Sequence, residues 1–213
     1  MGPILIADDH PLFRDALSAA VRRMQADVQI VEAATLAEAR SALERAAPGL
    51  LLLDLHMEDS QGFAGLIGIR HDWPALPVVV VSASEDPSVI RRAIEFGASG
   101  FIPKSSDLPT ICTAIEAVLS GDVWTPAAIA EDPEPDAEAS RLATLTPAQL
   151  RVLIGLKQGR LNKQIAFDMG ISEATVKAHV TAVFRKLGVI NRTQAVLAAE
   201  ALDVSQPAVS NSA

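Results

Sequence analysis

The sequence predicts an α/β domain with a doubly wound, five-stranded parallel sheet, followed by a smaller all-α domain. Short apolar runs alternate with helical patterns through residues 1–122, whereas only helical patterns occur after residue 144. A proline-rich acidic stretch separates the two regions. The length of 213 residues allows two small domains. A composition that is 49% hydrophobic and 21% charged is typical of a globular chain rather than a disordered one.

Five apolar segments predict the strands. They include continuous runs such as LLLL and VVVV, which are typical of strands buried on both faces of a parallel sheet. The predicted strands are Ile4–Ala7, Val28–Ala33, Leu50–Leu53, Pro77–Ser82 and Gly100–Ile102.

Helical patterns fill the intervals between these strands. Thr35 can cap the second helix, and Pro87 suits the first turn of the fourth. The predicted helices are Pro11–Met24, Leu36–Ala46, Phe63–Arg70, Pro87–Phe96 and Leu108–Ser120. Five βα repeats of this length make a doubly wound α/β domain.

The C-terminal region is predicted to be helical throughout. Thr146 with Pro147, and Ser172 with Glu173, are N-terminal helix signals. The predicted helices are Pro147–Lys157, Asn162–Met169, Glu173–Leu187 and Arg192–Ala201. We assign residues 1–122 to the α/β domain, 123–143 to an extended acidic linker, 144–202 to the all-α domain and 203–213 to a disordered tail.

The charges are distributed unevenly along the chain. The net charge of −8 argues at first against a nucleic-acid partner. However, residues 1–139 hold 9 basic and 22 acidic side chains, which is −13, whereas residues 140–213 hold 9 basic and 4 acidic ones, which is +5. This asymmetry indicates a basic interaction module joined to an acidic domain.

Three features limit the class of protein. The single Cys112 excludes an intramolecular disulfide framework and a cysteine-based zinc cluster. No apolar stretch reaches the ~18 residues that a membrane span requires. Two aspartates follow the first short apolar run, so we expect neither a signal peptide nor a lipidation box. We therefore expect a cytoplasmic protein with no membrane partner.

Polar residues stand at the carboxyl ends of four predicted strands, where doubly wound sheets place their functional sites. They are Asp8 and Asp9, Asp54, Ser82, and Lys104 just past the fifth strand. In the strand order 2-1-3-4-5 the three carboxylates converge, and their mutual repulsion calls for a cation such as Mg²⁺. A lysine and a hydroxyl opposite them can bind phosphate oxygens, which is the equipment for an aspartyl-phosphate. Taken singly, such an aspartate is more often a cap or turn residue and such a lysine a solvated charge.

The segments ILIADDHPLFR, LLLLDLHM with Gly62 following, VVVVSAS and GASGFIPKS resemble the receiver domain of bacterial two-component response regulators, across residues 3–122. The resemblance implies that Asp54 accepts a phosphoryl group from the phosphohistidine of a sensor histidine kinase. It also implies that Mg²⁺ binds to Asp9, Asp54 and the backbone carbonyl of His56, with Asp8 acting through a metal-bound water.

The same resemblance implies roles for three more side chains. Lys104 would pair with the phosphoryl group, and Ser82 would hydrogen-bond to it in the active state. Phe101 occupies the position of the switch aromatic, and a plain core aromatic on the fifth strand is the alternative.

One segment departs from the family pattern. After Asp54 the family usually reads Met-Pro-Gly, whereas this chain has Met57, Glu58 and Asp59. Loss of the proline loosens the turn, and two acids are added near an anionic pocket. The sequence leaves open whether they tighten magnesium binding or hinder phosphoryl approach. The side chain of His56 either tunes the lifetime of the phosphoaspartate or is a surface loop histidine.

The all-α region has the layout of a helix-turn-helix. A short helix, a turn with Gly170 and a longer helix follow one another, and the longer helix would enter the major groove of DNA. A solvated basic helix is the plainer alternative. The polar and basic residues of the longer helix are Thr175, Lys177, Thr181, Arg185 and Lys186.

The segments NKQIA, ISEATVKAHV, FRKLGV and NRTQAV resemble, in order and spacing, the DNA-binding domain of the LuxR/NarL/FixJ class. The resemblance implies base-edge contacts from Lys177, Ala178 and Thr181. It implies phosphate contacts from Asn162, Lys163, Thr175, His179 and Arg185. It also implies dimerisation through the last helix, with Gln194, Ala195 and residues 197–199 on the shared face.

The leading hypothesis is a DNA-binding response regulator of the NarL/FixJ type, with no enzymatic turnover beyond the phosphorylation chemistry of Asp54. Its partners would be a sensor histidine kinase, double-stranded DNA, RNA polymerase and, when active, a second copy of the chain. A phosphorylation-independent regulator is the main alternative, suggested by Glu58 and Asp59. A haloacid-dehalogenase-like hydrolase fits less well, because its nucleophile follows strand one in a DxD pattern. A small-molecule-sensing regulator is disfavoured by the absence of tyrosine.

Overall fold

The computed structural model describes residues 2–126 and 136–204. They form two compact units, an N-terminal one and one that comprises residues 136–203. Among the helices of the described ranges, none combines the length and the apolarity that a membrane crossing requires.

The N-terminal unit is built on a five-stranded parallel sheet, as the sequence predicts. The order is β2-β1-β3-β6-β7, with every neighbouring pair parallel. The strands are β1 (Ile4–Ala7), β2 (Ile30–Ala33), β3 (Leu50–Asp54), β6 (Val78–Ser82) and β7 (Gly100–Pro103). β2 begins two residues later than predicted, because the amide of Val28 turns back to donate to the carbonyl of Gln25 at 3.3 Å.

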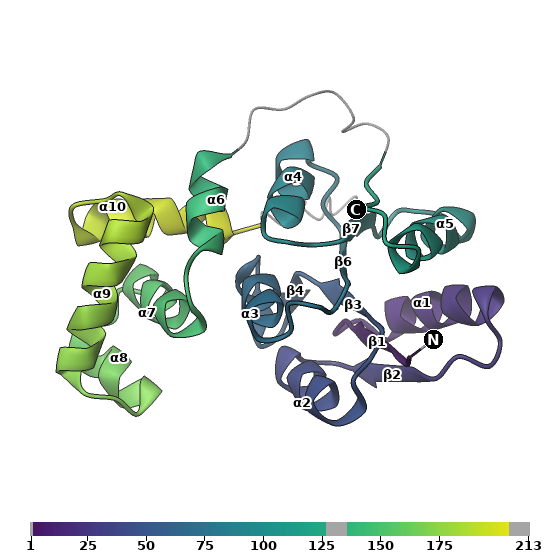
Figure 1. Ribbon diagram of the computed structural model, residues 1–213, viewed down its shortest axis with the longest axis horizontal. Coiled ribbons are helices and arrows are strands. Elements are labelled where there is room, and N and C mark those ends of the chain that lie inside the picture. Colours follow the sequence, from purple (N-terminus) through teal and green to yellow (C-terminus); the bar gives the residue numbers. More distant parts are fainter. Residues whose placement is uncertain (1, 127–135, 205–213) are drawn as a thin grey trace, which may run out of the picture. The chain divides into compact units, whose positions relative to one another are not determined.

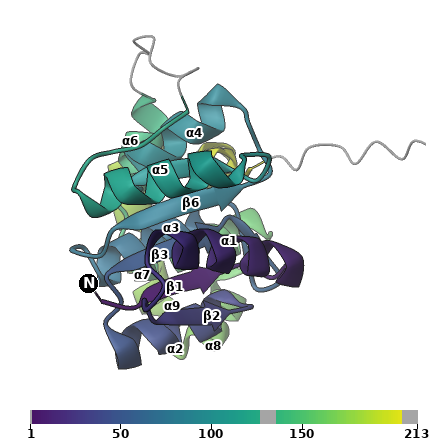
Figure 2. The same cartoon turned by 90° about the vertical axis from the view of Figure 1, so that its right-hand side faces the viewer.

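Helices cover both faces of this sheet. Figures 1 and 2 show α1 (Pro11–Met24) and α5 (Leu108–Leu119) on one face, and α2 (Leu36–Ala46), α3 (Ala64–Asp72) and α4 (Pro87–Glu95) on the other. The aliphatic runs of β1, β3 and β6 are fully buried between these layers. The predicted cap is confirmed, since the Thr35 side chain accepts the amide of Glu38 at 3.1 Å. The covered faces leave the carboxyl ends of the strands as the place for polar chemistry.

A small hairpin follows β3 that the sequence analysis did not predict. It consists of β4 (His56–Met57) and β5 (Ser60–Gln61), which pair in antiparallel fashion. Two residues per strand carry no alternation that a pattern search can detect. The third helix, predicted over Phe63–Arg70, follows the hairpin and spans Ala64–Asp72.

The C-terminal unit is all helical, as predicted. Its helices are α6 (Ala137–Ala143), α7 (Pro147–Lys157), α8 (Asn162–Met169), α9 (Glu173–Leu187), α10 (Arg192–Ala198) and the 3₁₀ helix η2 (Ala199–Leu202). A core from α7, α8 and α9 includes Val152, Leu156, Ile165 and Val176. Thr146 forms a reciprocal capping box with Gln149, which explains the sharp start of α7.

Part of the predicted linker was wrong. Residues 137–143, assigned to an extended acidic linker over 123–143, form α6, which packs against α9 and η2. Ala139 and Leu142, three positions apart, are fully buried, and Asp136 caps the helix through the amides of Glu138 and Ala139. The sequence did not predict this helix because its two buried apolar residues stand among acidic ones. Residues 127–135 of the linker and 205–213 of the predicted tail lie outside the described ranges.

Candidate functional site

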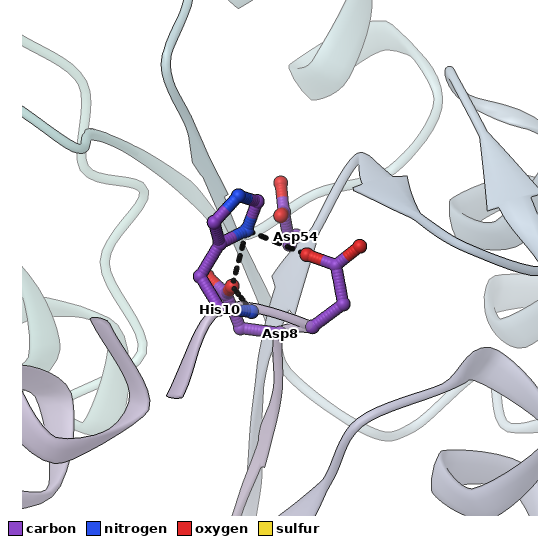
Figure 3. A group of neighbouring side chains, drawn as sticks. Asp8, His10 and Asp54 are labelled. Atoms are coloured by element: carbon purple, nitrogen blue, oxygen red, sulfur yellow. Dashed lines mark hydrogen bonds and ion pairs between the residues drawn. The ribbon is translucent and has the colours of Figure 1, made fainter. Parts of the chain in front are cut away.

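The register of the sheet brings the predicted carboxylates together. Ala7 pairs with Leu53, so that Asp8 and Asp54 follow side by side at the ends of β1 and β3. Both residues are buried, with 1% and 3% of their surfaces exposed. Ligand atoms of Asp8, Asp9, His10 and Asp54 all lie within 4.8 Å of one another, and Asp8, His10 and Asp54 are labelled in Figure 3. The convergence predicted from the strand ends is thus confirmed.

Lys104 supplies the positive charge of this group. Ser82 pairs with Pro103, and the next residue, Lys104, donates its amide to the carbonyl of Ser82 at 2.7 Å. Its Nζ lies 2.7 Å from Asp8 Oδ2 and 2.8 Å from Asp54 Oδ2. The same ammonium lies 4.9 Å from the ring centre of Phe13, a cation–π contact. One cation therefore serves two buried carboxylates.

The loop after β1 completes the acidic pocket. His10 Nδ1 lies 2.6 Å from Asp9 Oδ1 and 3.4 Å from Asp8 Oδ1, and the His10 amide donates to Asp8 Oδ1 at 2.8 Å. Arg14 holds the backbone here by donating to the carbonyl of Asp8 at 2.6 Å. Sequence reasoning missed His10 and Arg14 as site residues, although both stand in the DDHPLFR segment.

The oxygen atoms present fit a hard divalent cation. Asp8 Oδ2 and Asp9 Oδ1 are buried and accept no hydrogen bond of good geometry from the described residues. The ammonium of Lys104 neutralises one of the three carboxylate charges, so the pocket keeps a net negative charge. Carboxylate oxygens are the ligands that Mg²⁺ prefers.

The remaining predicted site residues lie close to this pocket or in the sheet beside it. The amide of His56 donates to Asp54 Oδ1 at 3.1 Å, which places its backbone next to the acceptor carboxylate. Ser82 is fully buried, and its hydroxyl accepts the amide of Ser84 at 3.2 Å. Phe101 is fully buried in β7, as a core aromatic would be, and its switch role remains a prediction.

The two acids of the departing segment do not both face the pocket. Asp59 turns its carboxylate to the start of α2, where it accepts the amides of Leu36 and Ala37. Glu58 is exposed. The expectation that both acids add to the anionic pocket was wrong for Asp59.

Burial raises the pKa of the Asp54 carboxyl. The hydrogen bond and the charge of Lys104 act in the opposite direction, Asp8 adds to the increase, and the amide of His56 lowers the pKa slightly. The net direction is upward, so the native protein holds the Asp54 proton to a higher pH than the unfolded chain does.

This shift predicts that Asp54→Asn stabilises the metal-free protein. Between the ordinary pKa and the raised one, the native state binds more protons than the unfolded state, so stability falls as pH rises through that window. In EDTA at pH 7.5, we expect Asp54→Asn to increase the free energy of unfolding, because the substitution removes a buried charge. Urea unfolding at pH 7.5 and pH 5 measures this gain, which should shrink at the lower pH. Equal stability at pH 7.5 would mean that the Lys104 contact offsets the burial.

In the C-terminal unit, α8 and α9 form the predicted helix-turn-helix. Gly170, in the left-handed region at φ 65°, ends α8, and Ser172 caps α9. Val176, Val183 and Leu187 turn inward from α9. The predicted DNA-contacting residues all retain exposed surface: Lys163, Thr175, Lys177, Ala178, Thr181 and Arg185 are exposed, whereas Asn162 and His179 are partly so.

Several cations of this unit stabilise its own fold. Lys186 Nζ donates to the carbonyl of Thr144 at 2.7 Å and to Gln149 Oε1 at 2.8 Å. Arg192 donates to the carbonyls of Leu156 at 3.1 Å and Arg160 at 2.7 Å. Lys186 was predicted to belong to the polar DNA-facing residues of the longer helix, whereas its ammonium connects α9 to the start of α7.

The predicted dimer face on the last helix is partly wrong. Ala195 and Ala198 are buried because α10 packs on α7 and α9, and Ala199 is buried because η2 packs on α6 and α7. Gln194 and Leu197 are exposed, with 55% of Leu197 accessible. A shared face can therefore use these two residues but not the alanines.

Comparison with known families agrees with both units. Residues 4–116 match the response regulator receiver domain, and residues 143–199 match the bacterial regulatory proteins of the luxR family. The chain belongs to the response regulators, with a receiver domain followed by a LuxR-type DNA-binding domain.

Relatives align with this chain over nearly their whole lengths. The chain is 42% identical to the glycerol metabolism activator of Pseudomonas putida, across 95% of this chain and 97% of that one. It is 32% identical to the nitrate/nitrite response regulator protein NarP of Escherichia coli, across 91% and 92%. A structure of two RcsB dimers bound to two parallel DNAs shares the fold, with a TM-score of 0.58 at 20% identity over 94% of this chain and 98% of that one.

Proposed function

We propose that the protein regulates transcription by binding DNA under the control of phosphorylation at Asp54. The observation that carries this proposal is the buried Asp54 carboxylate beside Asp8, with Lys104 Nζ at 2.8 Å. The donor of the phosphoryl group is a phosphohistidine of a sensor histidine kinase, and the protein acts in the cytoplasm. Two-component regulators of this kind have no turnover of a separate substrate.

The chemistry follows from the groups in the pocket. An Asp54 oxygen forms a bond to phosphorus while the phosphorus–nitrogen bond to the donor imidazole breaks, and the released imidazole takes up a proton. Lys104 then exchanges its contact with the carboxylate for one with a phosphoryl oxygen, and the Ser82 hydroxyl binds another. Asp9, Asp54 and the His56 carbonyl would hold Mg²⁺ directly and Asp8 through water, and the ion supplies neutralising charge for the phosphoryl oxygens. Hydrolysis of the phosphoaspartate returns the carboxylate.

The output belongs to the C-terminal unit. Phosphorylation would change Ser82, Phe101 and α4, and would promote dimerisation on paired half-sites. On DNA, α9 lies in the major groove, with Lys177, Ala178 and Thr181 at base edges. The phosphate contacts come from Asn162, Lys163, Thr175, His179 and Arg185. RNA polymerase is the further partner of a dimer bound at a promoter.

Phosphorylation can be tested with acetyl phosphate, a small-molecule donor. With Mg²⁺, we expect wild type to gain the mass of one phosphoryl group and Asp54→Asn to gain none. No gain in wild type would contradict the phosphoacceptor role. The DNA affinity with and without beryllofluoride and Mg²⁺ then separates control by phosphorylation from the phosphorylation-independent alternative, for which the affinity stays unchanged.

A further inference from the structure

Asp59 caps a helix that is distant in the sequence. Its Oδ1 accepts the amide of Leu36 at 2.7 Å, and its Oδ2 accepts the amide of Ala37 at 2.9 Å. These are the first two residues of α2, whose next amide, that of Glu38, is accepted by Thr35. The first amides of a helix have no partner within the helix, and its N-terminus favours negative charge. One carboxylate therefore ties the β4–β5 turn to α2 with two charge-assisted hydrogen bonds.

Close packing at the start of α3 also connects the hairpin to α2. A Cβ on Gly65 would lie 2.8 Å from the Ser60 hydroxyl and 3.3 Å from a methyl group of Leu36. The hairpin, the start of α2 and the start of α3 thus meet at a glycine, where an added Cβ would require the Ser60 hydroxyl to shift. The hairpin therefore contacts both helices, while its turn residues Glu58 and Asp59 are exposed to solvent.

The anchored turn belongs to the segment that carries part of the pocket. His56, in β4, donates its amide to Asp54 Oδ1 at 3.1 Å, and its carbonyl is the backbone ligand in the proposed Mg²⁺ site. Only two residue pairs, His56 with Gln61 and Met57 with Ser60, hold the hairpin together. So short a ladder is marginal without external support. Glu58, which follows Met57, does not fix the backbone of the turn as a proline would.

We propose that Asp59 is a positioning residue that fixes the β4–β5 hairpin, and with it the His56 carbonyl, for Mg²⁺ binding. This inference rests on the proposed function. Asp59 would act by capping α2 and not by adding its charge to the acidic pocket.

The neighbouring acid provides a matched control. Glu58 is exposed and makes no hydrogen bond or ion pair among the described residues, so Glu58→Ala removes one negative charge from the same turn without breaking the cap. Asp59→Ala removes the same charge and both hydrogen bonds. Asp59→Asn keeps one acceptor oxygen and serves where the alanine variant does not fold.

Two measurements on the full-length chain test the proposal. Isothermal titration with Mg²⁺ alone, at a temperature where circular dichroism shows each variant folded, should give a roughly tenfold weaker affinity for Asp59→Ala. The affinity of Glu58→Ala should stay within about twofold of wild type, since exposed charges are well screened. Amide hydrogen exchange should be faster at Leu36 and Ala37 in Asp59→Ala only. Asp59→Asn should lie between wild type and Asp59→Ala in both measurements.

Each outcome has a distinct meaning. Faster exchange with Mg²⁺ affinity equal to that of Glu58→Ala would make Asp59 a helix cap only and overturn the positioning role. Unchanged exchange at Leu36 and Ala37 would overturn the tie itself. Wild type that binds no Mg²⁺ and takes no phosphoryl group from acetyl phosphate would overturn the proposed function and this inference with it.

Discussion

Lys104→Met is expected to lower the free energy of unfolding of the metal-free protein by about 3 kcal/mol at neutral pH. Lys104 Nζ lies 2.7 Å from Asp8 and 2.8 Å from Asp54, whose side chains are 1% and 2% exposed. Without the ammonium, two adjacent buried carboxylates face each other with no cation between them. Methionine retains much of the aliphatic volume of lysine, so the loss reports charge rather than a cavity. Urea unfolding in EDTA measures it.

Two conditions should reverse this loss. Lower pH protonates Asp54, whose pKa rises further once the Lys104 contact is gone, so the deficit should shrink as pH falls toward 5. Adding Asp54→Asn to Lys104→Met removes one of the two charges and should recover part of the stability at pH 7.5. Lys104→Arg retains the charge and is the control. A metal-free Lys104→Met protein as stable as wild type would contradict the pairing on which the pocket is built.

The sequence predicted the pocket well because its members stand at strand ends. Once the parallel sheet and its order are known, the register alone places Asp8 beside Asp54 and Lys104 beside Ser82. What such reasoning could not find are contacts that depend on structure outside the parallel sheet. Asp59 and Leu36 are 23 positions apart, and the two-residue strands that bring them together have no periodic pattern.

The same limit applies to the basic module. Counting charges gave +5 for residues 140–213 but could not say which cations serve the fold. Lys186 and Arg192 are bound to backbone oxygens 42 and 32 to 36 positions away. Lys157 and Arg160 pair with Asp203 and Asp168. Only the folded structure separates these from the exposed Lys163, Lys177 and Arg185, which remain available for a polyanion.

In the proposed function, Lys177 is the cation of α9 that discriminates between DNA sequences. Its Nζ lies 3.1 Å from Glu173 Oε1 one turn earlier, and 65% of the Lys177 side chain is exposed. An exposed pair of this kind contributes at most about 1 kcal/mol, so DNA can displace Glu173 at little cost. Thr181, one turn later, donates its hydroxyl to the carbonyl of Lys177 at 3.0 Å, which leaves its methyl group as the outward contact. We therefore expect the Lys177 ammonium to contact a guanine edge and the Thr181 methyl group to contact a thymine methyl.

Lys177→Ala should accordingly cost about 1–3 kcal/mol per half-site on duplexes that wild type selects from a random library, and relax base preference at one position. Lys163→Ala should weaken binding to selected and unselected duplexes alike, and reduce the slope of log K against log salt by about 1. Arg151→Ala removes the same charge from an exposed position on α7 outside the predicted contacts, and should leave specificity intact. Fluorescence anisotropy at several salt concentrations distinguishes the three variants. An equal loss of affinity for all duplexes in Lys177→Ala would mean that Lys177 contacts a DNA phosphate. Base recognition by α9 would then depend on Ala178 and Thr181 alone.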